Sequence, residues 1–213
     1  HTFRFPFDVR IRRIEKNHPA FECPVDDLQA FRFARAFSEI HRSDGERDGY
    51  YYDVFVQHFD AAGAKVGSEV RVNLPVSGAW YTSQSEPSIA LLNGAAGDFV
   101  VSWTDNVLDG SGYGVYAQRF NADGSTDGSQ FRVNTYTDSN QSQSSVAALQ
   151  GGGFVVVWTS FGEDTWGDGV YGQRYDAAGN AVGAEFRVNY NTVNYQHRPT
   201  VTGLVNGGFV VAW

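Results

Sequence analysis

The stretch GGGFVVVWTSFGEDTWGDGVYGQRY (residues 151–175) holds two short apolar runs separated by a loop rich in Asp and Gly. The first run recurs as FVVSW (99–103), FVVVW (154–158) and FVVAW (209–213), with two spacings of 55 residues (154 − 99 and 209 − 154). The second recurs as VFVQHF (54–59), VYAQRF (115–120) and VYGQRY (170–175). A fixed period of this kind indicates a tandem repeat.

Two more runs recur with the same period. They are VRVN (70–73), FRVN (131–134) and FRVN (186–189), and PSIALL (87–92), SSVAAL (144–149) and PTVTGL (199–204). The four runs of one repeat are rich in Val, Phe and Tyr and are bounded by Gly, Asn, Asp or Ser, which is typical of β-strands joined by hairpins. The repeat therefore predicts an all-β fold, a β-propeller-like array of four-stranded antiparallel blades.

The pattern also predicts how the chain is organised. Residues 1–49 form a divergent N-terminal segment, either a partial blade or a cap, in which residues 28–41 are expected to be a strand at the position of FVVVW. Residues 50–213 are tandem repeats, with two full blades and a partial blade at either end. Because a closed propeller takes about four to eight blades, we expect the chain to be a fragment that is completed by neighbouring repeats of the same or another chain.

Charge and hydropathy exclude two classes of partner. The net charge is −8, and residues 50–213 carry seven Lys and Arg (16 − 9) against fifteen Asp and Glu (24 − 9). A nucleic-acid surface needs clustered cations, so no nucleic-acid partner is expected. The sequence also has no apolar run long enough to insert into a membrane.

The repeat phrase GGFVVVWTS…DG…GVYGQRYDAAGNAVGAEFRVN resembles tandem repeats of very large secreted bacterial proteins of the haemolysin-type calcium-binding (RTX) and adhesin-like class. The resemblance implies secretion or attachment to the cell surface, a calcium-rich exterior and a role in adhesion. The Gly-Gly-x-Gly-x-Asp nonapeptides that bind calcium in a β-roll are absent from this chain. A calcium site therefore cannot be transferred from those nonapeptides.

An aspartate recurs six positions before the GVYGQRF-like run, in an Asp- and Gly-rich loop. Carboxylates clustered in such a loop are ligands that Ca²⁺ prefers. Alternatively, these side chains accept backbone N–H bonds and cap the turns. Calcium is the one cofactor that the sequence suggests, and its candidate ligands are Asp105, Asp109, Asp164 and Asp168.

Other recurring residues are expected to be architectural, because a ligand site is usually built once. Glutamines recur ahead of the SSVAAL-like run (Gln84, Gln141, Gln196), and we expect their amides to bridge strands or blades. The equivalent tryptophans Trp103, Trp158 and Trp213 are expected to pack between blades. The small residues Ala117 and Gly172 recur in the third run and suggest close approach of another sheet.

Aromatic residues that do not recur are the candidates for ligand binding. In a four-stranded meander, the second loop and the connection to the next blade emerge at the same end. Aromatic rings there, beside Asp, Asn and Gln, provide what sugar recognition needs. The alternative is packing on a neighbouring loop. The candidates are Trp80, Tyr81, Tyr113, Tyr136, Trp166 and Tyr195.

These features favour a non-catalytic binding or adhesion module with a carbohydrate or other cell-surface ligand. No nucleophile elbow or phosphate-binding motif is present in the sequence, and the five histidines have no metal-ligand spacing. Two alternatives stay open: an enzyme of the glycosidase or lyase type, for which no carboxylate pair is singled out, and a purely structural spacer.

Overall fold

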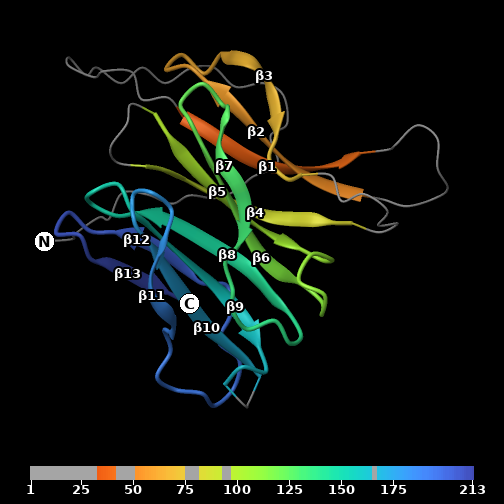
Figure 1. Ribbon diagram of the computed structural model, residues 1–213, viewed down its shortest axis with the longest axis vertical. Helices are drawn as coiled ribbons and strands as arrows, with labels where there is room; N and C mark the ends of the chain where they lie inside the picture. Colours follow the sequence, from red (N-terminus) through yellow and green to blue (C-terminus); the bar gives the residue numbers. More distant parts are fainter. Residues whose placement is uncertain (1–32, 42–50, 75–81, 93–96, 165–166) are drawn as a thin grey trace, which may run out of the picture.

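A computed structural model describes residues 33–41, 51–74, 82–92, 97–164 and 167–213 (Figure 1). The strands form antiparallel sheets that we number I to IV in chain order. Sheet I contains β1 (Phe33–His41), β2 (Tyr51–Phe59) and β3 (Lys65–Arg71), and sheet II contains β4 (Gln84–Leu91), β5 (Phe99–Asp105), β6 (Gly114–Phe120) and β7 (Thr126–Arg132). Sheet III contains β8 (Gln141–Ala148), β9 (Phe154–Phe161), β10 (Asp168–Tyr175) and β11 (Ala181–Arg187), and sheet IV contains β12 (Thr200–Gly203) and β13 (Phe209–Ala212).

The four-stranded antiparallel repeat is confirmed. Sheets II and III are meanders in chain order, and their second and third strands pair in the same register, Trp103 opposite Tyr116 and Trp158 opposite Tyr171. The strand expected within residues 28–41 is present as β1, which pairs with β2 along its whole length. Residues 1–32 and 42–50 lie outside the described residues, so the division at residue 49 stays a prediction.

Each sheet interface is an apolar core. The strands β5 and β9 are buried at almost every position because their alternate residues pack against the sheets on either side. Between sheets I and II, Val54 and Val56 meet Phe99 and Trp103. Full burial of one such side chain contributes about 1.5–3 kcal/mol. The remaining interfaces join sheets II and III (Val100, Val115, Phe154, Trp158) and sheets III and IV (Val155, Val157, Val201, Val211).

Packing was expected for all three equivalent tryptophans and is confirmed for two. Trp103 and Trp158 are fully buried. Trp213 is 55% exposed, because sheet IV has two described strands and no described sheet beyond it.

The close approach of another sheet that was expected at Gly172 is not what the structure shows. A Cβ there would lie 2.8 Å from the ring of Phe186, which belongs to the same sheet. That ring, and not another sheet, fills the space.

The first strands of successive sheets lie side by side, whereas the fourth strands lie at the periphery. The Val146 N–H of β8 donates to the Ser88 hydroxyl of β4 (3.1 Å), and the Val201 N–H of β12 donates to Ser145 of β8 (3.3 Å). The outer strands β7 and β11 are mostly exposed or half-buried. The sheets fan out from one another in Figure 1, and this arrangement resembles part of a β-propeller.

A buried amide pair joins each sheet to the next. The side-chain oxygen of Asn134, two residues after β7, accepts the Val115 N–H (2.8 Å), and its amide donates to Gln141 at the start of β8 (3.2 Å). The same pair forms between sheets I and II, where it is buried, and between sheets III and IV, where it is partly buried. This confirms the bridging role expected for the recurring glutamines, whose partners are Asn73 for Gln84 (3.0 Å) and Asn189 for Gln196 (3.1 Å).

Among the residues that the structure describes, no helical segment has the length and apolarity needed to span a membrane.

Replacing Asn134 by Ala should lower the free energy of unfolding by about 2–4 kcal/mol, because the backbone N–H of Val115 and the side-chain amide oxygen of Gln141 would lose their buried partner. Urea unfolding measures this loss. The matched control is Asn121→Ala, since Asn121 makes only an exposed side-chain bond to Ser125. Equal stability of the two variants would contradict a structural role for the buried pair.

Candidate functional site

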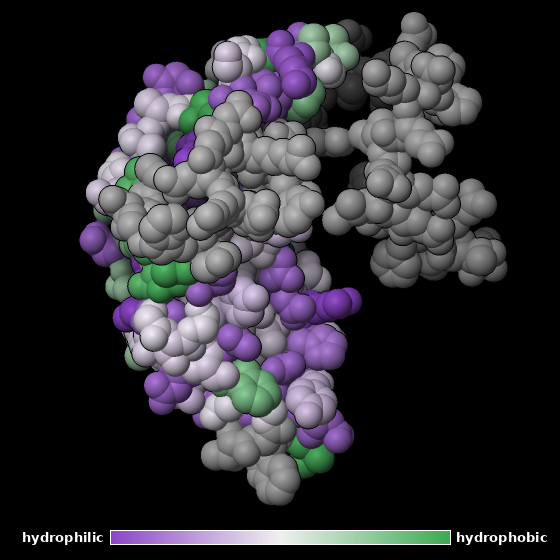
Figure 2. Space-filling view, turned by 90° about the vertical axis from the view of Figure 1, so that its right-hand side faces the viewer, coloured by the Kyte–Doolittle hydropathy of each residue, from purple (hydrophilic) through white to green (hydrophobic). Residues whose placement is uncertain are grey.

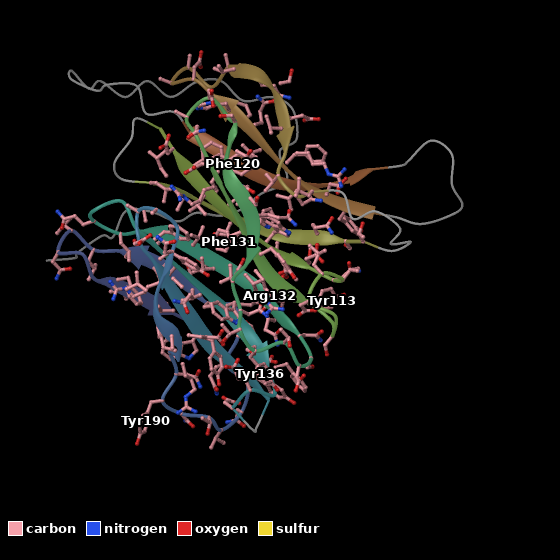
Figure 3. All side chains as sticks on the ribbon, in the orientation of Figure 1. Tyr113, Phe120, Phe131, Arg132, Tyr136 and Tyr190 are labelled. Atoms are coloured by element: carbon pink, nitrogen blue, oxygen red, sulfur yellow. The ribbon has the colours of Figure 1, made fainter. Side chains whose placement is uncertain are left out.

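A pocket of about 240 Å³ opens where β8, β9, β10 and the entry to β12 meet. We call it the β8–β12 pocket. It lies at the end of the sheets where the second loop and the connection to the next sheet emerge, which is also the end that carries the aromatic residues predicted for ligand binding. Tyr113 and Tyr136 are labelled at this lower end of sheets II and III in Figure 3. The pocket is lined by Asn140, Ser142, Gln143, Thr159, Phe161, Asp168, His197 and Arg198.

A recurring backbone distortion, in the first strands of sheets II and III and just before the first strand of sheet IV, shapes this pocket. Glu86, Gln143 and Arg198 occupy equivalent positions and have positive φ values of 55°, 58° and 56°. The pairing register shifts across the first two of them, as at a β-bulge. A non-glycine residue in this conformation costs about 1–2 kcal/mol, so surrounding interactions must hold it.

Hydrogen bonds between sheets hold these positions. One carboxylate oxygen of Glu86 accepts both the Thr104 hydroxyl of its own sheet (3.0 Å) and the Gln143 N–H of the next sheet (3.0 Å). The amide oxygen of Gln143 repeats the arrangement, accepting the Thr159 hydroxyl (3.1 Å) and the Arg198 N–H (3.1 Å). We call this recurring arrangement the acceptor link. It fixes the backbone that surrounds the β8–β12 pocket.

The charged residues of the pocket come from two sheets. The His197 ring nitrogen Nδ1 lies 3.8 Å from an Asp168 carboxylate oxygen. Partial burial raises the pKa of Asp168, His197 lowers it again, and the nearby Asp164 carboxylate raises it further. Arg198 is exposed beside this pair, and Phe161 presents a ring that is 45% exposed. Cation, carboxylate, amide, hydroxyl and aromatic ring therefore surround one small cavity.

Three of the predicted aromatic residues lie around this end of the molecule. The Tyr113 carbonyl accepts the Gln141 N–H at 2.7 Å, and the ring is 43% exposed. Tyr195 is 67% exposed but packs against Gly167, the contact with a neighbouring loop that was the alternative to ligand binding. Tyr136 is half-buried, and its hydroxyl lies near Gly162. Trp80, Tyr81 and Trp166 fall outside the described residues, and sugar binding by the whole set stays a prediction.

The aspartates proposed for calcium are placed differently from one another. Asp105 is buried and accepts the Gln84 amide (2.7 Å) and two backbone N–H groups of its own loop. Asp109 accepts the Ser111 N–H (3.1 Å). These are the capping bonds that were the alternative to calcium. Asp168 faces His197 in the pocket, and Asp164 is buried near Gly169.

Within the described parts of the chain, no three His, Cys, Asp or Glu residues come together as a metal-binding group. Calcium binding by Asp105, Asp109, Asp164 and Asp168 therefore stays a prediction.

The structure adds a carboxyl group that sequence reasoning missed. Glu163 lies in the loop after β9, and burial raises its pKa to about 8; the Ser160 hydroxyl lowers the value, and a hydrogen bond with Glu185 raises it. One repeat earlier, its position is occupied by Leu108 (163 − 55), which packs on the core between sheets I and II. The replacement of an apolar residue, Leu108, by an ionisable one, Glu163, at the same position of the repeat was the signal in the sequence that could have indicated this carboxyl group.

The Glu163 and Glu185 carboxyl groups are close enough for Glu185 to raise the pKa of Glu163. Neither residue lines the β8–β12 pocket.

Comparisons with known proteins assign no sequence family. No family model and no curated protein matches the chain. Among solved structures, an endo-arabinase from Bacteroides thetaiotaomicron matches with a TM-score of 0.42 and 15% identity, over 82% of this chain and 68% of that one. The match is to a distant structure, and the resemblance to RTX and adhesin-like repeats stays a prediction.

Figure 2, turned by 90° from Figure 1, shows hydrophilic and near-neutral side chains with small apolar patches on the described part of that face.

The Glu163 carboxyl should make stability depend on pH. Its pKa in the folded protein, about 8, lies above its ordinary value of 4.5, so the folded protein binds more protons between those values. The stabilisation is complete below about pH 4.5 and is lost as the pH rises through about 8. Thermal unfolding from pH 5 to 9 should show a falling Tm, with a shallower fall in Glu163→Gln.

The matched control is Glu69→Gln, because Glu69 is the exposed counterpart of Glu185 on β3. This variant should keep the slope of the unmodified protein. An unchanged slope in Glu163→Gln would show that Glu163 ionises normally in the folded protein.

Proposed function

We propose that the chain is a non-catalytic carbohydrate-binding module and that the β8–β12 pocket is its binding site. The observation that carries this proposal is the lining of the pocket. Hydroxyl, amide and charged side chains surround a cavity of about 240 Å³ beside the half-exposed ring of Phe161. Sugar rings stack their C–H faces on aromatic rings, while amides and carboxylates bind their hydroxyl groups.

The size and position of the pocket fit a short segment of a glycan. The volume is below the about 300–1,000 Å³ of pockets that enclose drug-sized ligands, and it suits one sugar residue of a longer chain. Tyr113 and Tyr136 lie around the same end (Figure 3), and together with the exposed Tyr195 they would extend the contact to neighbouring sugar residues. Secretion and adhesion are part of this proposal, on the basis of the resemblance described above.

Binding is favoured over catalysis by the arrangement of carboxyl groups in the described chain. The pocket contains one carboxylate, that of Asp168, which faces His197. Hydrolysis by the usual glycosidase mechanism requires two. A spacer role alone would leave the gathering of polar groups in this pocket without a purpose.

Phe161→Ala should weaken glycan binding about tenfold, because the sugar would lose its stacking surface at the pocket. A glycan array, run once with calcium and once with EDTA, first identifies a binding glycan. Titration of that glycan into both proteins then measures the change. The matched control is Tyr190→Ala, since Tyr190 is 97% exposed and does not line the pocket.

The outcomes separate the alternatives. Loss of binding in EDTA would support the predicted calcium site. Unchanged affinity in Phe161→Ala would contradict the pocket as the binding site. Glycan cleavage by the folded protein would favour the enzyme, and no binding to any glycan would favour the spacer.

A further inference from the structure

The pocket contains a departure from the repeat. At the bulge of the first strand, sheets II and III carry Glu86 and Gln143, whose side-chain oxygens accept an N–H of the next sheet. The equivalent residue before sheet IV is Arg198, and a guanidinium has no acceptor. Arg198 therefore cannot repeat the acceptor link, and this position carries a different group.

The Arg198 guanidinium is available to a ligand. The side chain is exposed and lines the pocket, and it makes no hydrogen bond or ion pair with any described residue. Its backbone N–H is the group that bonds to Gln143 and Thr159. The backbone is therefore fixed while the guanidinium remains free to bind.

The two amide side chains that line the pocket offer a ligand mainly hydrogen-bond donors. The Gln143 oxygen is occupied by the Thr159 hydroxyl and the Arg198 N–H, which leaves its NH₂ group for a ligand. The Asn140 oxygen accepts the Tyr113 N–H at 3.2 Å, which leaves its NH₂ group as well. Together with Arg198, these groups present several N–H donors and no free amide acceptor to a ligand in the pocket. Donors in excess suit an anionic oxygen, and a guanidinium matches a carboxylate with two parallel hydrogen bonds.

The pocket also has a negatively charged lining residue. Asp168 is the one carboxylate among the residues that line the pocket, and one of its oxygens lies 3.8 Å from the His197 ring nitrogen Nδ1, which forms an ion pair with it when the histidine is protonated. The chain carries a net charge of −8, so an unspecific site for anions is not expected elsewhere on its surface. The cationic position is local and built into the pocket.

We propose that the β8–β12 pocket is specific for acidic saccharides, with the carboxylate of a hexuronate on Arg198 and its ring on Phe161. This inference rests on the proposed function, because it names the class of sugar for the same pocket. Asn140 and Gln143 donate to the carboxylate or to the adjacent hydroxyl group, and Asp168 accepts a sugar hydroxyl.

The test is calorimetric titration of the whole chain with three matched probes. They are trigalacturonate, its methyl ester, in which each carboxylate is neutral, and the uncharged galactotriose. Sialyllactose against lactose forms a second arm, which distinguishes a sialic acid from a uronate as the source of the carboxylate. The unmodified protein should bind trigalacturonate at least tenfold more tightly than the ester, because a charge-assisted bidentate pair is lost.

Arg198→Gln is the informative variant. It places at this position the residue that sheet III already carries, so the fold should be retained, and thermal unfolding checks this. The preference for the acid over the ester should fall to within about twofold, while binding of the ester persists. Arg174→Gln is the matched control, an exposed arginine on β10 outside the pocket, and it should keep the preference.

The possible negative results distinguish a failure of the acidic-sugar inference from a failure of the proposed function. Equal affinity for acid and ester in the unmodified protein, or a preference that survives in Arg198→Gln, would overturn the acidic-sugar inference and leave the carbohydrate module standing. A preference for sialyllactose without binding of trigalacturonate would overturn the hexuronate assignment. Absence of saccharide binding by the folded protein would overturn the proposed function together with this inference.

Discussion

The buried pairing of Asn and Gln amides is the contact on which the rest of the array depends. Each asparagine follows the last strand of one sheet, accepts an N–H from the preceding strand of that sheet, and donates to the glutamine at or ahead of the start of the next sheet. Amides buried away from water must be satisfied, so the two ends can meet in few ways. The bulge follows two residues after Gln141, and its position is fixed as a result. The pocket at Gln143 is thus a consequence of how the sheets are joined.

Much of the fold could be predicted from the sequence because the signal was repeated. One Val-rich run is ambiguous between helix and strand, but three copies at one spacing, each bounded by Gly, define a meander. Recurrence also indicated a structural role for Gln84, Gln141 and Gln196, which form buried or, for Gln196, partly buried hydrogen bonds to asparagines. Gly172 was misread because sequence shows that a side chain is missing there, and does not show which neighbour fills the space.

The site was less predictable for a physical reason. The bulge residues Glu86, Gln143 and Arg198 differ in charge and share a backbone conformation, which has no fixed sequence signature. The loop end and its aromatic residues could be inferred from topology alone, whereas the lining residues Asn140, Thr159 and His197 come together only through the register of the sheets. Glu163 is half-buried, and its counterpart one repeat earlier, Leu108, packs on the core between sheets I and II, a placement that the sequence pattern does not indicate.

The acceptor link has a direction. The N–H always comes from the later sheet and the oxygen from the earlier one, so each repeat presents an acceptor forward and a donor backward. Repeats with Glu or Gln at the bulge therefore both supply the oxygen that this contact needs, and duplication of the gene segment for one of them would supply it to an inserted sheet. The repeat that begins with Arg198 lacks this property. In the evolutionary history of such arrays, growth by duplication and the acquisition of a charged pocket are expected to occur in different repeats.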